Sequence, residues 1–240
     1  MGKTEETTTG RERLIFALDV PSRKEAEALA DELADDVGVF KVGLELFVAE
    51  GPSLVRALTK RRPVFLDLKL HDIPETVDRA VARAVDLEVA FLTVHASGGS
   101  EMLERAAKRV EGTKTQILAV TVLTSSDAAM LASIGVSGTV SDHVLRLAKL
   151  ASTRRITGFV ASPHEVALLR GALPRETVLV IPGIRPSGTL ANDDQKRAAT
   201  PTTAIRDGAS YLVVGRPIRD AKNRKEAARS IVLEIEAALR

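Results

Sequence analysis

Short apolar runs recur along the chain, and between them apolar residues fall at helical spacing. The runs are rich in β-branched residues and apolar on both faces, which is typical of strands in a parallel sheet covered by helices. The predicted strands are Leu14–Leu18, Val39–Val42, Val64–Leu68, Ala90–Val94, Ile117–Leu123, Gly158–Ala161, Val178–Ile181 and Tyr211–Val214.

The segments between these runs carry helix signals. Ser22 with Glu25 and Ser162 with Glu165 have capping-box spacing, and Pro163 stands at the first helical position. The last segment predicts a helix from Asn223 to Arg240, with four residues facing inward: Ala227, Ile231, Ile235 and Leu239.

Eight strand-and-helix units in 240 residues most simply close into a single (β/α)8 TIM barrel. A doubly wound open sheet is the alternative that the length permits. We expect a flexible N-terminal tail over residues 1–10 and one barrel domain over residues 11–240, because no linker, low-complexity segment or charge block divides the chain.

Composition narrows the classes of function. The net charge is only +2, aromatic residues make up 3% of the chain and Trp is absent, so a nucleic-acid partner is not expected. No run approaches the roughly 18 apolar residues of a membrane span, and the N-terminus has no apolar signal core. With no cysteine either, the chain is expected to be cytoplasmic and to make no membrane contact.

Polar residues follow every predicted strand, where a barrel has its C-terminal mouth and its active site. The strongest signal follows the third run: Asp67 and Lys69 are two apart on a strand and therefore point to one face, with Asp72 just beyond. A structural ion pair is the simpler interpretation of such a pair. Asp19 and Lys41 end the first two strands at the same mouth, which favours a functional site.

A phosphate group on this fold commonly sits at the loops after strands seven and eight. Those loops supply Arg185 and the pair Gly215 and Arg216, a glycine for close backbone approach and guanidinium groups for bidentate contacts. The connection from Pro186 to Thr200 is long for a compact barrel and has the length of a lid. A surface insertion without this role is the alternative.

The chain resembles the orotidine 5′-monophosphate decarboxylases in blocks that occur in family order over nearly its whole length. The blocks are Ala17–Asp19, Lys41–Gly43, Asp67–Pro74 (Asp-Leu-Lys-Leu-His-Asp-Ile-Pro), Val94–Gly99, Val120–Ser125, Pro182–Pro186 and Gly215–Ile218. The segments freest of the family pattern are the N-terminal tail and residues 127–139.

The resemblance implies decarboxylation of orotidine 5′-monophosphate to uridine 5′-monophosphate, the last step of de novo UMP synthesis, without metal or cofactor. In that family pattern Lys69 stabilises the C6 carbanion and protonates it, while Asp67 lies beside the substrate carboxylate. Asp72 reaches into the neighbouring subunit's site and completes an alternating array with Lys41. A homodimer is therefore expected, with Asp72 and Thr76 contributed across its interface.

The resemblance also implies how the substrate is held. Asp19 and Lys41 bind ribose hydroxyls, Thr124 and Ser125 contact the pyrimidine, and the loop over the phosphate supplies Gln195. The full set of expected substrate contacts is Asp19, Lys41, Asp67, Ile73, Thr76, Thr124, Ser125, Pro182, Arg185, Gln195, Gly215 and Arg216.

Three rival interpretations remain. Sugar-phosphate decarboxylases and hexulose-phosphate synthases share the Asp-x-Lys-x-x-Asp pattern but use it to hold magnesium, and they usually follow the second Asp with small residues instead of Ile73-Pro74. An RNA-binding or scaffolding role rests on the pI near 9.0 alone. A metal site at His71 and Glu75 lacks a third ligand, and Pro74 between them argues against a regular helical turn.

Overall fold

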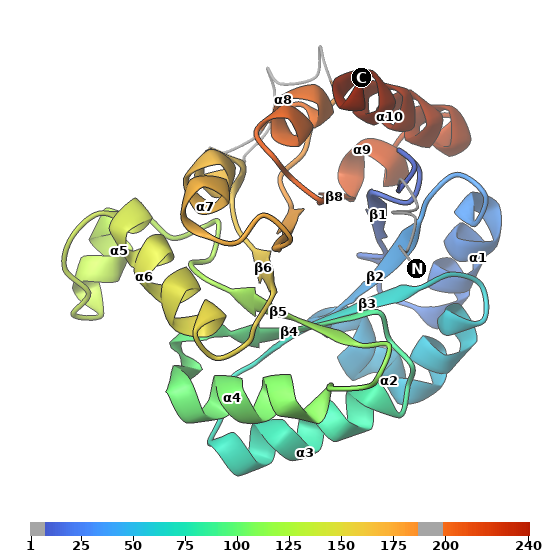
Figure 1. The fold of residues 1–240 in the computed structure, drawn as a ribbon. Coiled ribbons are helices and arrows are strands. Elements are labelled where there is room, and N and C mark those ends of the chain that lie inside the picture. Colours follow the sequence, from blue (N-terminus) through green and yellow to red (C-terminus); the bar gives the residue numbers. More distant parts are fainter. Residues whose placement is uncertain (1–7, 187–198) are drawn as a thin grey trace, which may run out of the picture.

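Eight parallel strands close into a barrel in chain order, β1 to β8, in a computed structural model that describes residues 8–186 and 199–240 (Figure 1). Closure comes from pairing of β8 with β1, in which Leu14 lies opposite Leu212. The strands are β1 (Leu14–Ala17), β2 (Val39–Gly43), β3 (Val64–Leu70), β4 (Phe91–His95), β5 (Gln116–Val120), β6 (Gly158–Val160), β7 (Val178–Ile181) and β8 (Tyr211–Val214). The predicted (β/α)8 barrel is therefore confirmed, and the open doubly wound sheet is wrong.

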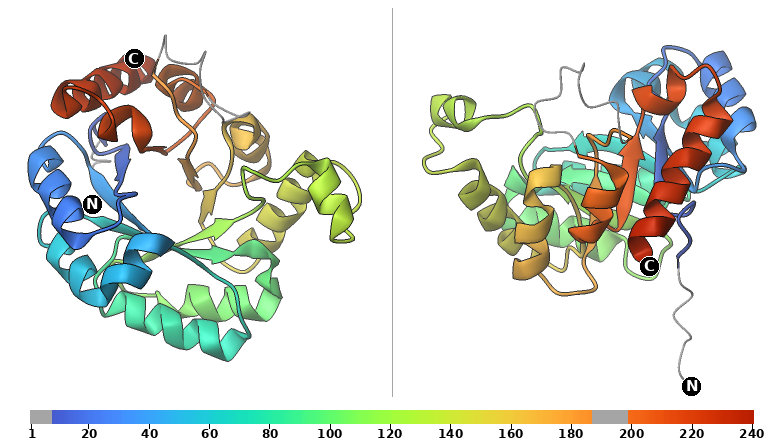
Figure 2. Two further views of the ribbon diagram at one scale, coloured as in Figure 1. Left: turned by 180° about the vertical axis from the view of Figure 1, so that it is seen from behind. Right: turned by 90° about the horizontal axis from the view of Figure 1, so that it is seen from above.

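Helices surround the barrel, one or more after each strand (Figures 1 and 2). They are α1 (Arg23–Leu33), α2 (Leu44–Thr59), α3 (Pro74–Val85), α4 (Gly99–Arg109), α5 (Ala128–Ser133), α6 (Val140–Ser152), α7 (Val166–Ala172), α8 (Pro201–Arg206), α9 (Arg216–Arg219) and α10 (Arg224–Leu239), with 3₁₀ turns η1 (Ala96–Gly98) and η2 (Pro163–Glu165). The predicted starts are confirmed where a side chain caps the helix: Ser22 accepts the N–H of Glu25 in α1. Asn223 caps α10 in the same way.

Most predicted strand bounds lie within one or two residues of the observed ones, and two details of the predicted elements differ more. The fifth strand ends at Val120 instead of Leu123. Val122 is buried by packing although the chain has already left the strand ladder, so its apolar character does not mark a strand residue. In α10 the inward face is Ala228, Ile231 and Ile235, whereas Leu239 is 45% exposed at the end of the helix. Spacings of three and four place Ala228 on the stripe through the two isoleucines and move Ala227 to its flank.

Alternate strand residues face the barrel axis and form an interior core distinct from the layer between strands and helices. Phe91 of β4 contacts both Phe65 of β3 and Tyr211 of β8, with ring centroids 6.1 and 5.2 Å apart. Because β4 and β8 lie on opposite sides of the barrel, the second contact crosses its axis. The interior cluster comprises Ile15, Ala17, Val39, Phe65, Phe91, Leu118, Val180 and Val213.

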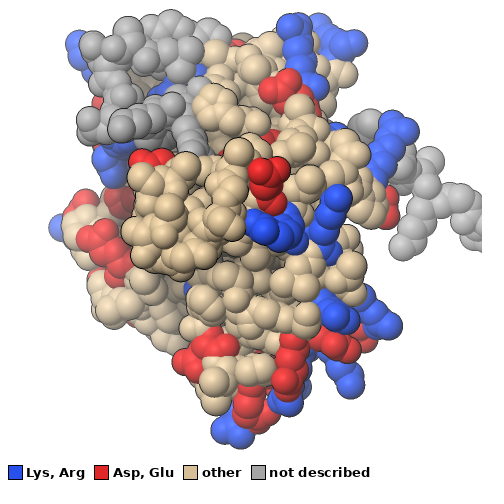
Figure 3. Space-filling model, turned by 90° about the vertical axis from the view of Figure 1, so that its left-hand side faces the viewer, with Lys and Arg blue, Asp and Glu red and all other residues tan. Residues whose placement is uncertain are grey.

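The surface is mixed in character. On the face shown in Figure 3, basic and acidic side chains are interspersed among uncharged ones instead of forming a continuous basic surface. The α5 segment, in the region freest of the family pattern, projects from the barrel body (Figures 1 and 2). Within the described residues, no helix combines the length and the apolar character needed to cross a bilayer.

Candidate active site

The alternation that fills the barrel interior also places the candidate residues. Asp19, Lys41 and Asp67 each stand two positions after an interior residue, namely Ala17, Val39 and Phe65. Their side chains therefore continue the interior face beyond the packed core and into the C-terminal mouth. A cavity of about 240 Å³ opens there, lined by all three residues together with Lys69.

The four residues form a continuous chain of opposite charges. Lys41 Nζ lies 2.8 Å from Asp19 Oδ1 and 4.0 Å from Asp67 Oδ2. Lys69 Nζ lies 2.8 Å from both carboxylate oxygens of Asp67. The side chains of Lys41 and Asp67 are only 11% and 15% exposed, so Asp67 is a largely desolvated anion between two ammonium groups. Such a group is costly unless its partners are held in place, which indicates a built site.

The backbone at Lys69 departs from a regular strand. Its φ is +51°, in the left-handed region that residues other than glycine seldom adopt. The register between β3 and β4 shifts between Leu66 and Leu70, so Lys69 lies inside an irregularity of the ladder. Its N–H is instead bonded to Thr93 Oγ1 of β4, at 2.9 Å. Strained backbone of this kind clusters at functional sites and persists only when its surroundings fix it.

Thr93 is a residue of the site that the sequence prediction missed. It is fully buried, and its hydroxyl donates to Asp67 Oδ1 at 3.0 Å while accepting the N–H of Lys69. The signal was present in the alternation, because Thr93 stands two positions after the interior residue Phe91, as Asp67 does after Phe65. An uncharged polar residue within an apolar run is not distinguished by the sequence pattern from an ordinary strand residue.

Asp72, Ile73 and Thr76 lie apart from this ion-pair chain within the single subunit. Asp72 is exposed, and its Oδ1 accepts the N–H of Ile73 at 2.6 Å. Ile73 is 65% exposed, and Thr76 is exposed in the first turn of α3. The structure therefore brings together Asp19, Lys41, Asp67 and Lys69 but leaves the Asp72 segment facing outward.

The predicted phosphate residues follow β7 and β8. Pro182 and Gly183 come directly after β7, and Gly215 precedes α9, which begins with the exposed Arg216. Gly215 lies close to the mouth, since a Cβ built on it would be 3.6 Å from Asp19 Oδ2. Arg185 is only 6% exposed, and its Nη1 donates to the carbonyl of Ile184 at 2.9 Å.

The two ends of the predicted lid are joined at its base. The N–H of Arg185 donates to the carbonyl of Ala199 at 2.9 Å, and Ala199 donates back to Gly183 at 3.3 Å. Gln195 and most of the predicted lid, residues 187–198, lie outside the described residues. Thr124 and Ser125 are exposed in the turn after β5 and add no contact to the charged chain.

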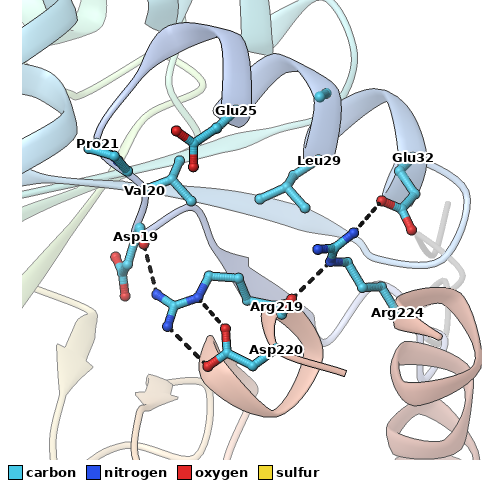
Figure 4. Close-up of a pocket in the computed structure, with 10 residues that line it drawn as sticks. Asp19, Val20, Pro21, Glu25, Leu29, Glu32, Arg219, Asp220 and Arg224 are labelled. Carbon is cyan, nitrogen blue, oxygen red and sulfur yellow. Dashed lines mark hydrogen bonds and ion pairs between the residues drawn. The ribbon is translucent and has the colours of Figure 1, made fainter. Parts of the chain in front are cut away.

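A second cleft adjoins the mouth, between α1, α9 and the start of α10 (Figure 4). Its guanidinium groups are occupied within the protein: Arg219 donates to the carbonyl of Asp19 at 2.8 Å and to Asp220 at 2.7 Å. Arg224 is bonded to Glu32 at 3.2 Å. We interpret this cleft as structural, since Arg219 fixes the end of β1 against α9.

Two histidines lie beside Lys69. The rings of His71 and His95 are 5.4 Å apart. The pKa of His95 is lowered from 6.5, chiefly by burial and then by the neighbouring His71 and Lys69, with Asp67 opposing the shift. Because the folded pKa is the lower one, the unfolded chain binds more protons below about pH 6.5, and stability falls as the pH drops through that range.

His95→Asn is therefore expected to lessen the loss of stability on acidification. Urea unfolding at about pH 5 and pH 8 would measure the free energy of unfolding in both forms. Some loss should remain, because burial and then Arg146 lower the pKa of His143 as well. His164→Asn, at an exposed position, is the control; a variant at His95 that loses as much stability as the wild type would contradict the assignment.

Comparison with known proteins agrees with this architecture. Residues 12–231 match the Orotidine 5'-phosphate decarboxylase / HUMPS family. The chain is 53% identical over 221 residues to the orotidine 5'-phosphate decarboxylase of Anaeromyxobacter dehalogenans, covering 92% of this chain and 96% of that protein. It is 48% identical over 234 residues to the enzyme of that name from Gluconobacter oxydans, covering 95% of this chain and 99% of that protein.

A solved structure gives the same result. The crystal structure of orotidine 5'-phosphate decarboxylase from Lactobacillus acidophilus superimposes with a TM-score of 0.82 at 36% identity, covering 92% of this chain and 98% of that one. Fold, order of the motifs and sequence identity over almost the whole chain agree. The chain belongs to the Orotidine 5'-phosphate decarboxylase / HUMPS family.

Proposed function

We propose that the protein is an orotidine 5′-phosphate decarboxylase that forms uridine 5′-monophosphate, the last step of pyrimidine nucleotide synthesis. The observation that carries the proposal is the Lys41–Asp67–Lys69 chain of charges at the barrel mouth, with Lys69 Nζ 2.8 Å from both oxygens of Asp67. The names of relatives up to 53% identical support the choice of substrate.

In the proposed reaction the bond between C6 and the carboxylate carbon breaks, CO2 leaves, and the electron pair stays on C6. The ammonium group of Lys69 stabilises this charge as it develops, then transfers a proton to C6 and regains one from water. Asp67 holds the ammonium group in position. Asp67 would also lie beside the substrate carboxylate, and two carboxylates at close range disfavour each other's ionised forms. We assign the larger share of the rate enhancement to Lys69, because its interaction with C6 strengthens as negative charge develops there in the transition state.

Binding is assigned to the two sides of the mouth. Asp19 and Lys41, whose side chains lie 2.8 Å apart, are proposed to hold ribose hydroxyls. Gly215 and Arg216, at the start of α9, are proposed to bind the phosphate with Arg185. We retain Gln195 and the segment from Pro186 to Thr200 as the proposed lid. Closure on the remote phosphate can then assist chemistry at C6.

The active form is proposed to be a homodimer in which Asp72 and Thr76 enter the partner's site. An apolar surface between α2 and α3 supports this assembly: a cavity of about 480 Å³ there is lined by residues such as Phe47, Leu68 and Leu70. Leu44 and Val48 of α2 and Ile73, which precedes α3, are 59%, 75% and 65% exposed. Exposed apolar side chains near a charged site that lacks Asp72 are suited to bind a second copy of the chain, which would supply that residue.

The magnesium-dependent relatives are the second candidate. In the described residues no three or more His, Asp and Glu side chains are grouped so as to hold a metal ion. The position facing both oxygens of Asp67 is taken by Lys69 Nζ. This arrangement supports proton donation by the lysine over coordination of a cation by Asp67 and Asp72.

The test is the ultraviolet absorbance of orotidine 5′-monophosphate after addition of the purified protein and excess EDTA. We expect rapid loss of the orotate absorbance, undiminished by EDTA. Failure to turn over this substrate, combined with magnesium-dependent activity on a sugar phosphate, would instead assign the chain to the other branch of the family.

A further inference from the structure

Thr93 is a neutral residue that contacts both central catalytic candidates, Asp67 and Lys69. Its side chain is 0% exposed, so the hydroxyl is shielded from water. It donates to Asp67 Oδ1 at 3.0 Å and accepts from the backbone N–H of Lys69 at 2.9 Å. A single hydroxyl therefore uses its proton on the carboxylate of one residue and a lone pair on the backbone of the other.

The second bond matters because of the backbone conformation at Lys69. The strand irregularity between Leu66 and Leu70 removes the N–H of Lys69 from the β3–β4 ladder. A buried N–H without a partner is costly, and the positive φ of +51° adds strain. Thr93 supplies the missing acceptor, and in doing so it stabilises the bend that directs Lys69 Nζ onto Asp67.

The first bond fixes the carboxylate that faces this lysine. Asp67 lies between Lys41 and Lys69, and without a third contact it could rotate towards either ammonium group. The hydroxyl of Thr93 binds Oδ1, while Lys41 lies 4.0 Å from Oδ2. The two oxygens share Lys69 but differ in their second partner, which defines the orientation of the carboxylate plane.

We propose that Thr93 is a positioning residue for decarboxylation, which sets the relative placement of Asp67 and Lys69 and contacts no substrate. The inference rests on the proposed function and deepens it. Because the expected ribose and phosphate contacts come from other strand ends, loss of the hydroxyl should lower kcat and leave KM for orotidine 5′-monophosphate nearly unchanged. A misplacement of about 1 Å at such a site can reduce the rate by about 100-fold.

The experiment compares Thr93→Val, which keeps the shape and removes the hydroxyl, with Thr93→Ser, which restores it. We expect kcat to fall by about 10- to 100-fold in the valine variant and to recover most of the way in the serine variant. Thr115→Val is the matched control. Thr115 is also buried, and its hydroxyl donates to the carbonyl of Val89 at 2.7 Å, outside the site. This control should lose stability and keep its kcat.

Uridine 5′-monophosphate binding, measured by calorimetry, gives the fraction of folded sites and corrects kcat for each variant. If the valine variant does not fold, Thr93→Ala provides the same test. An undiminished kcat, a loss shared equally by Thr115→Val, or a failure of serine to rescue would each overturn the inference. Inactivity of the wild type would overturn the proposed function itself and this inference with it.

Discussion

Lys69→Ala is expected to abolish decarboxylation, lowering kcat by at least about 10⁴-fold. The substitution removes both the cation that stabilises the developing charge on C6 and the donor of its proton, and each contribution is typically worth about 10²-fold or more. The variant should still fold, because Asp67 retains two partners: Lys41 Nζ at 4.0 Å from Oδ2 and the hydroxyl of Thr93 at 3.0 Å from Oδ1. The measurement is the rate of absorbance loss of orotidine 5′-monophosphate at saturating substrate.

Two further variants make this result specific. Lys69→Arg keeps the positive charge but replaces the ammonium group by a guanidinium that does not release its proton, so it separates charge stabilisation from proton donation. Lys114→Ala removes an exposed lysine whose Nζ lies 3.8 Å from Glu88 and should leave the rate unchanged. Lys69→Ala with nearly wild-type turnover would refute the proposed mechanism.

The second large effect concerns Asp72 and the assembly of the site. Lys69→Ala and Asp72→Asn homodimers should each be almost inactive, whereas a heterodimer of the two should regain about half of the wild-type activity. In the heterodimer one site combines Lys69 of one subunit with Asp72 of the other and is complete. Co-expression with two different affinity tags and purification on both isolates this species.

The matched control for this experiment pairs Lys69→Ala with Asp67→Asn. Asp67 and Lys69 lie 2.8 Å apart in the same subunit, so each site of that heterodimer lacks one of them and no activity should return. An inactive heterodimer of Lys69→Ala and Asp72→Asn would show that Asp72 acts within its own subunit or not at all. Failure to recover a doubly tagged species would argue against the dimer.

Local patterns in the sequence were sufficient to predict the fold and the members of the charged chain. Hydrophobic runs, caps and strand-end polarity act over a few residues, so the eight strands and the capped starts of α1 and α10 follow directly from them. Spacing by two along a strand predicted that Asp67 and Lys69 share one face, and the 2.8 Å contact between their side chains agrees with it. The resemblance of the motifs then identified the family, which the comparisons confirm.

The tertiary structure alone decided how the charged residues are held. The bend at Lys69 and its bond to Thr93 depend on the register between β3 and β4, which exists only once the two strands pair. The tertiary structure also decided the end of β5, because strand pairing stops at Val120 although Val122 is still buried by packing. A backbone N–H that has lost its ladder partner leaves no mark in the local pattern of residues, because its replacement comes from a strand more than 20 residues away.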